Sequence, residues 1–122
     1  MERRMMAVEE ILNMPSMNEW GEATVRDWIE MDAVDILEDE EYQDLIEDTK
    51  VRGYNRDPVH IGSAPDVYAD YCSYQGMPDL VRASDKMLGN GHHRIAILYL
   101  LGLKQAYYTT DYDESYKRHI EF

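Results

Sequence analysis

The sequence has little cysteine and no long apolar run, and both shortages exclude classes of protein. Cys72 is the only cysteine among 122 residues, which excludes a disulfide framework. The longest apolar run, residues 95–101, is well short of the roughly 20 residues that a transmembrane helix needs. The first residues have no apolar core of the kind found in signal peptides. We therefore expect a cytoplasmic protein with no membrane partner.

Basic residues are scarce as well, and the shortage is concentrated in one part of the chain. Lysine and arginine number 12 against 25 aspartates and glutamates, which gives a net charge of −13. Residues 1–48 hold 16 of the acidic residues and three of the basic ones, so the whole excess lies there. DNA repels such a surface, so we expect no general nucleic-acid binding. Two interpretations of this acidic half stay open: a solubilising surface, or a surface for a basic partner or a mimic of DNA.

The length and the hydrophobic pattern fit one domain of mixed α/β class. Hydrophobic residues make up 44% of the chain, enough for one core without a metal or disulfide staple. Apolar residues recur at helical or strand spacing in several segments. The predicted helices cover residues 2–12, 20–31, 38–52 and 92–101, and the tail from 111 forms a last helix. The predicted strands cover residues 34–37, 59–61 and 105–110, with a β-hairpin over 80–88 and a loop with a helical turn over 62–76. We expect a small mixed sheet with packed helices, preceded by N-terminal helices.

The most informative motif is GNGHHR, residues 89–94, between a predicted strand and the predicted helix 92–101. The first N–H groups of a helix have no partner within it and point outward at the positive end of its dipole. Gly91 lets the backbone approach a ligand closely, and Arg94 offers a planar fork suited to phosphate. His92 and His93 donate hydrogen bonds and titrate near neutral pH. The motif indicates an anion cradle, while a helix cap with a surface arginine fits the same residues.

The same segment resembles the signature of the ParB/sulfiredoxin superfamily. Residues 87–96 read MLGNGHHRIA and are followed by Leu-Gly at 101–102. This order is similar to the family's strand, Gly-x-His-Arg turn and Ala-rich helix that ends in Leu-Gly. The predicted helix that ends near residue 52 and the run DPVHI at 57–61 also follow the family's order. The resemblance implies a ParB/sulfiredoxin-like domain over residues 33–122, preceded by an acidic N-terminal helical extension over residues 1–32.

The resemblance also implies a ligand. Family members use this block to hold nucleotide phosphates: CTP in ParB, ATP in sulfiredoxin and ADP in the free serine kinases. It therefore implies that Asn90, Gly91, His92, His93 and Arg94 bind a nucleotide (ATP, ADP or CTP) with Mg²⁺, or another phosphorylated small molecule. Phosphotransfer or hydrolysis would be a further step, and the sequence leaves open whether the protein is an enzyme.

Departures from the family pattern limit what carries over. Sulfiredoxins have their reactive cysteine where this chain has His92, and 122 residues leave no room for the DNA-binding and dimerisation domains of full ParB proteins. Asn90 replaces the aspartate of the kinase-like branch, and an amide is neither a base nor a charged Mg²⁺ ligand. Glu38 matches the general base of that branch, with Glu40 and Glu41 as rivals. An acidic run that caps a helix start is the alternative interpretation.

The remaining histidine patterns concern His60 and the adjacent pair His92 and His93. His60 lies in a predicted strand and faces either the cleft of the motif or the solvent, and solvent exposure is the expectation. His92 and His93 do not form a zinc site with a nearby carboxylate in our interpretation, because adjacent residues on a helix point about 100° apart. We expect no bound metal other than nucleotide-borne Mg²⁺.

Two functions compete with nucleotide binding. The first is an interaction protein of a phage or mobile element, acting in the host cytoplasm and binding a host protein through its acidic surface. The second is a ParB-like DNA nuclease, which the family label favours and the charge opposes, since a nuclease needs a basic track for its substrate.

Overall fold

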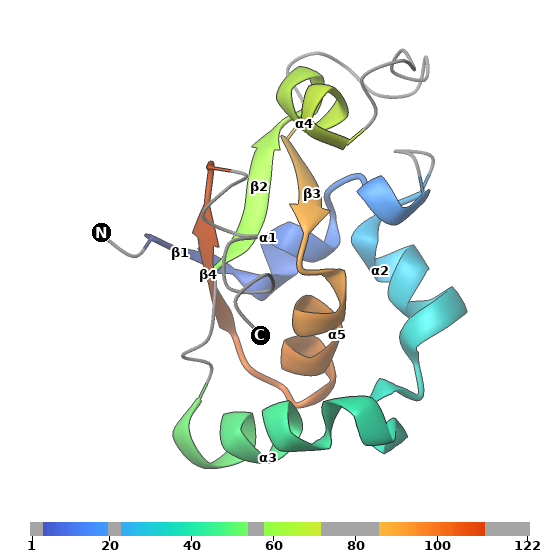
Figure 1. Ribbon diagram of the computed structural model, residues 1–122, viewed down its shortest axis with the longest axis vertical. Helices are drawn as coiled ribbons and strands as arrows, with labels where there is room; N and C mark the ends of the chain where they lie inside the picture. Colours follow the sequence, from blue (N-terminus) through green and yellow to red (C-terminus); the bar gives the residue numbers. More distant parts are fainter. Residues whose placement is uncertain (1–3, 20–22, 54–57, 72–85, 112–122) are drawn as a thin grey trace.

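The computed structural model describes residues 4–19, 23–53, 58–71 and 86–111, and a four-stranded mixed sheet forms its centre (Figure 1). In spatial order the strands are β1 (Arg4–Ala7), β4 (Gln105–Thr109), β2 (Val59–Ser63) and β3 (Lys86–Asn90). β1 runs antiparallel to β4, β4 runs parallel to β2, and β2 runs antiparallel to β3. The expected mixed α/β class with a small mixed sheet is thus confirmed.

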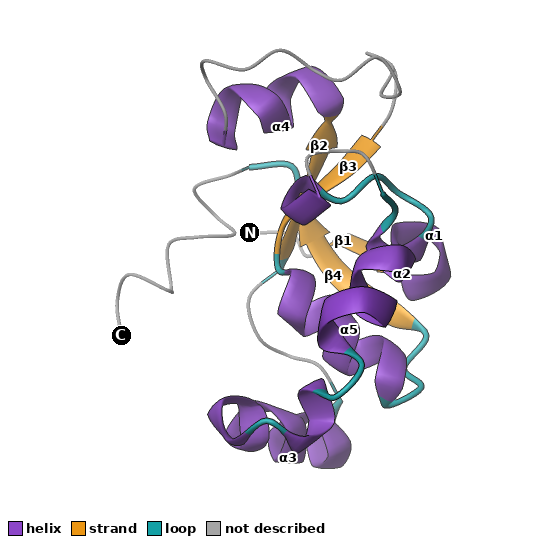
Figure 2. Cartoon of the chain, turned by 90° about the vertical axis from the view of Figure 1, so that its right-hand side faces the viewer, coloured by secondary structure: helices purple, strands orange, loops and turns teal. Residues whose placement is uncertain are grey.

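Helices surround the sheet. They are α1 (Val8–Leu12), α2 (Val25–Trp28), α3 (Gln43–Arg52), α4 (Ala64–Tyr71) and α5 (His92–Leu100). Short helical turns connect them: η1 (Met17–Glu19), η2 (Ile29–Ala33), η3 (Ile36–Glu38) and η4 (Glu40–Tyr42). Figure 1 shows α3 and α4 at opposite ends of the molecule, and Figure 2 views it from the side of α2 and α5, with β2 and β3 above them, next to α4. Within the described ranges, no helix has both the length and the apolar character needed to cross a membrane.

The core is built around α5. Ile95, Ala96, Ile97 and Leu98 are all buried, because four consecutive apolar residues cover more than half of the helix circumference. The N-terminal segment joins the same core: Ile11 is fully buried in the cluster that also contains α5. The acidic N-terminal half is therefore part of the same domain: β1 pairs with β4 in the sheet, and Ile11 packs in the same core as α5.

Several expected elements differ from the observed ones. The predicted helix over 2–12 begins as β1, whose Met6 is buried while Met5 is exposed, the alternation of a strand. The predicted strand over 34–37 is wrong: this segment forms a turn and η3, with Val34 exposed and Ile36 buried. The helix predicted over 20–31 is also shifted: α2 begins at Val25, after the capping residue Thr24.

The remaining elements are confirmed in part. α5, β4 and β2 lie at their predicted places, and β3 supplies the second strand of the predicted hairpin. The expected loop over 62–76 forms β2's end and then α4 as far as Tyr71. The first hairpin strand, near residues 80–83, and the tail from 112 lie outside the described residues.

Candidate functional site

The motif 89–94 forms a tight strand-to-helix turn. The register of β2 and β3 shifts by one residue here. His60 pairs with Asn90, but the next residue, Ile61, pairs with Leu88, so Gly89 is the extra residue of a β-bulge. Gly91 has φ of 97°, in the left-handed region that favours glycine, and α5 begins at the next residue. A Cβ at Gly91 would lie 2.5 Å from Cγ1 of Val59. Only glycine therefore lets β3 turn into α5 at this point without displacing β2.

Arg94 points inward and joins α5 to the start of β2. Its Nη1 donates a hydrogen bond to the carbonyl oxygen of Pro58 at 3.1 Å, and the residue is only 7% exposed. Hydrogen bonds from a charged donor are worth about 1.5–3 kcal/mol, more than neutral ones. At least part of the guanidinium fork is thus occupied by the protein's own backbone.

His92 also points inward. It is 3% exposed, and its ring meets the ring of Trp28 edge-on at a centroid distance of 5.3 Å. Burial, with smaller contributions from the nearby His93 and Arg94, lowers the pKa of His92 from 6.5 to about 3. Within the described residues its buried Nε2 has no hydrogen-bond partner. His92 is therefore neutral near pH 7 and brings no positive charge to the start of α5.

His93 points the other way, toward the surface. Its ring stacks on Tyr42 at 5.3 Å and 15°, and it meets Trp28 edge-on at the same distance. Partial burial between these rings lowers the pKa of His93, and the carboxylates of Glu41 and Asp39 oppose that shift. His93 is therefore mainly neutral near pH 7, although acidic side chains lie close to it.

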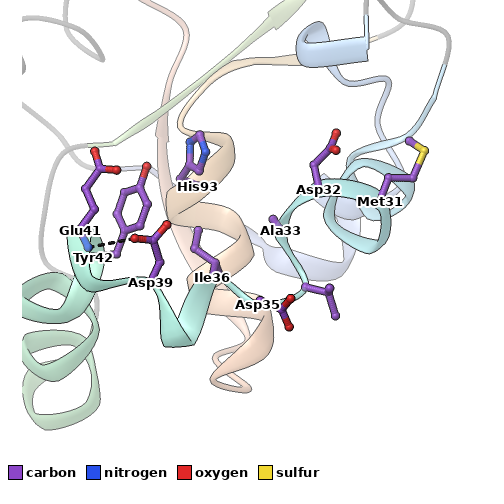
Figure 3. Close-up of a pocket in the computed structure, with 10 residues that line it drawn as sticks. Met31, Asp32, Ala33, Asp35, Ile36, Asp39, Glu41, Tyr42 and His93 are labelled. Atoms are coloured by element: carbon purple, nitrogen blue, oxygen red, sulfur yellow. Dashed lines mark hydrogen bonds between the residues drawn. The ribbon is translucent and has the colours of Figure 1, made fainter.

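A cavity of about 330 Å³ opens beside His93 (Figure 3). We call it the acidic cavity. Its lining residues are Met31, Asp32, Ala33, Val34, Asp35, Ile36, Asp39, Glu41, Tyr42 and His93. In Figure 3, Asp39 and Glu41 lie on one side of His93 and Asp32 on the other. Four of the ten lining side chains are carboxylates, and the single basic group among them is the neutral His93.

Local structure holds one side of the acidic cavity in place. Oδ1 of Asp39 accepts a hydrogen bond from the N–H of Glu41 at 2.9 Å and so caps η4. Burial, followed by the charges of Glu41 and Asp39, raises the pKa of Tyr42. The Tyr42 hydroxyl therefore stays protonated and remains a hydrogen-bond donor over a wide pH range.

The structure separates the residues that the sequence grouped together. Glu38 is exposed in η3 and does not line the acidic cavity, whereas Asp39 and Glu41 do. Asn90 lies at the end of β3, opposite His60 on β2. His60 is 1% exposed, so the expectation of solvent exposure is wrong: it lies in a strand covered by neighbouring elements. Whether any of these residues binds a ligand stays a prediction.

Sequence reasoning missed Tyr42 and most of the acidic cavity. Asp32, Asp35 and Asp39 follow one another at spacings of three and four, which marks one face of a helix. That signal was present, but the predicted strand over 34–37 interrupted it. Among the described residues, no group of three or more histidine, cysteine, aspartate or glutamate side chains is placed to hold a metal ion.

Comparisons with known proteins do not add to this geometry. No family model matches the chain, and no match was found among curated proteins or solved structures. The interpretation of the site therefore depends on its residues and their arrangement.

Proposed function

We propose that this chain is a binding module whose acidic cavity receives a positively charged group of a ligand or partner protein. One observation carries the proposal: four carboxylates line the acidic cavity, and His93 is the single basic residue among its lining residues. Like charges in a partly enclosed site repel one another, and a cationic guest relieves that repulsion. Near a protein surface, two opposite unit charges about 4 Å apart attract by roughly 4 kcal/mol.

The acidic half of the chain supports this proposal. Three of the four carboxylates, those of Asp32, Asp35 and Asp39, come from the segment between α2 and η4, within the 48 residues that hold all the excess negative charge. The surrounding potential therefore concentrates cations and speeds their approach to the acidic cavity. This agrees with an interaction protein that binds a basic partner.

Calorimetric titration with agmatine, a small guanidinium compound, tests the proposal. The double variant Asp39→Asn/Glu41→Gln should weaken binding at least about tenfold, since each lost charge pair is worth on the order of 1 kcal/mol in a partly solvated site. The matched control is Glu38→Gln/Glu40→Gln, which removes the same charge from the same segment but changes no lining residue. Equal losses in both variants, or no agmatine binding at all, would refute the proposal.

A second candidate function is phosphate binding at the start of α5. The left-handed Gly91, a nine-residue helix with no acidic residue in its first turn, and the unsatisfied His92 Nε2 favour it. Its strength would come from backbone N–H groups, because His92 is neutral and Arg94 donates to Pro58. The sequence resemblance to nucleotide-binding domains points the same way.

Mg²⁺ fits this second candidate. Mg²⁺ is usually held by one or two carboxylates together with phosphate oxygens and water, and Asp39 and Glu41 beside His93 supply such carboxylates. The ion would neutralise charge between those carboxylates and a nucleotide phosphate. Thermal-shift measurements with ATP, ADP, CTP and phosphate, each with and without Mg²⁺, test this candidate. Ligand at 100 times its dissociation constant should add about 2.7 kcal/mol, and no shift under any condition would exclude it.

A further inference from the structure

Two exposed apolar side chains lie at the edge of the acidic cavity. Met31 is 58% exposed and Val34 is 59% exposed, and both line it. The other large exposed hydrophobic residues of the described ranges, Met5 and Val51, are in β1 and α3 and line no part of it. A partner that covered these two side chains would bury their apolar area, which favours association. A small cation that bound only to the carboxylates would leave the side chains of Met31 and Val34 exposed to solvent.

The opposite side of the acidic cavity suits a planar cation. The stacked rings of Tyr42 and His93 form an aromatic wall next to the carboxylates of Asp39 and Glu41. A guanidinium group stacks on aromatic rings and donates two parallel hydrogen bonds to a carboxylate, whereas an ammonium group acts as a strongly hydrated point charge. This combination favours arginine over lysine.

The size of the acidic cavity indicates how much of a partner enters it. Its volume of about 330 Å³ is at the lower end of the range for ligand pockets. It therefore accommodates one side chain of a partner, while the neighbouring residues of that partner lie across the rim formed by Met31 and Val34.

From these observations we infer that the acidic cavity binds an arginine side chain of a partner protein whose flanking apolar residues pack on Met31 and Val34. The inference depends on the proposed cation-binding function and extends it to a protein segment of defined chemistry. The carboxylates and the aromatic wall together select arginine, and the exposed apolar rim selects its neighbours.

Four capped peptides test the inference: Gly-Arg-Gly, Leu-Arg-Leu, Gly-Lys-Gly and Leu-Lys-Leu. Leu-Arg-Leu should bind at least about fivefold more tightly than Gly-Arg-Gly, because each leucine buries apolar area on the rim. It should also bind several-fold more tightly than Leu-Lys-Leu. The variant Met31→Gln/Val34→Thr should abolish the leucine advantage, so that Leu-Arg-Leu and Gly-Arg-Gly bind equally, whereas Val51→Thr should leave that advantage intact.

Each failure has a distinct meaning. If agmatine binds but leucine adds no affinity, or if the rim variant keeps the leucine advantage, the inference is wrong and the proposed function stands. If lysine peptides bind as tightly as arginine peptides, the choice of arginine is wrong. If neither agmatine nor any peptide binds, the proposed function itself fails. Thermal melting of each variant is the control, and it should show that substitutions of these exposed residues leave the fold intact.

Discussion

The first turn of α5 has an inner side and an outer side, and its two histidines lie one on each. On the inner side His92 packs on Trp28, and Arg94 binds the backbone of Pro58. On the outer side His93 stacks on Tyr42 and lines the acidic cavity. Neighbouring residues of one motif thus serve two purposes: the inner side packs into the fold, and the outer side lines the acidic cavity.

This comparison changes how the motif is interpreted. A phosphate site that uses charged side chains needs them aimed at one point, yet burial makes His92 neutral and Arg94 is directed toward β2. Only the backbone N–H groups of the first turn of α5 would then hold a phosphate. The charge that does gather beside the helix start is negative, from Asp39, Glu41 and their neighbours. The difference between the two sides predicts large stability effects for inner substitutions and small ones for outer substitutions.

The largest effect is expected for Gly91→Ala. The new Cβ would lie 2.5 Å from Val59, and alanine would also carry the strain of a φ of 97°. Overpacking and left-handed strain each cost about 1–3 kcal/mol, so we expect a loss of about 4 kcal/mol in unfolding free energy. Gly102→Ala is the matched control: its φ is also positive, at 82°, but nothing lies within 4 Å of the added Cβ.

Urea denaturation of both glycine variants separates strain from collision. Gly102→Ala should lose only about 1 kcal/mol, the cost of the backbone conformation. Equal losses at the two positions would show that Val59 moves away easily, and the tight contact between the turn and β2 would then have no energetic importance.

Arg94→Ala should come next, with a loss of about 3 kcal/mol. The substitution removes a charge-assisted hydrogen bond to Pro58 and leaves its half-buried carbonyl with one partner fewer. The comparison is Arg26→Ala, which removes an ion pair with Glu9 and a hydrogen bond to Oδ1 of Asn13 at the surface. We expect a smaller loss there, because solvent screens exposed ion pairs. Chemical denaturation of both variants measures the difference. If Arg94→Ala is as mild as Arg26→Ala, Arg94 is not part of the inner framework.

The elements of the inner side could be predicted from the sequence because their signals are local. About fifteen consecutive residues contain all three signals. A strand pattern predicts β3, a glycine suits the left-handed turn at Gly91, and apolar residues at helical spacing predict α5. β1 could not be predicted in this way. Its partner β4 lies about a hundred residues further on, and four residues ending in an apolar helix carry too short a pattern to reveal a strand.

The outer side was harder to predict because it joins separate segments. The acidic cavity combines residues of η2, of the segment that contains η3 and η4, and His93 of α5. Glu38 directly follows the predicted strand over 34–37, but the segment forms a turn and η3, and Asp39 and Glu41 line the cavity instead. Which nitrogen and oxygen atoms of a motif face inward depends on packing partners distant in sequence, such as Trp28 and Pro58.

Acid should destabilise the protein partly through His92. A histidine in the unfolded chain takes up a proton near its ordinary pKa of 6.5, whereas the folded state keeps His92 neutral down to about pH 3. The depressed pKa therefore makes the native state lose stability as pH falls below 6.5, by up to about 2 kcal/mol at pH 5. Urea titrations at pH 7 and pH 5 should show that His92→Gln removes more of this dependence than His93→Gln does. The opposite order would contradict the inner placement of His92.

The smallest effect is expected on the outer side, in the stack of Tyr42 and His93. Because the rings are nearly parallel at 5.3 Å, their interaction should contribute about 1 kcal/mol beyond the area they bury. A double-mutant cycle of Tyr42→Leu and His93→Gln, measured by urea denaturation, isolates that coupling from the individual losses. A parallel cycle of His93→Gln and Val51→Thr should give a coupling near zero, since Val51 is exposed on α3 and outside the cavity lining. A coupling for Tyr42 and His93 as small as that control would mean that the aromatic wall is not preformed, and a guanidinium ligand would have to order it on binding.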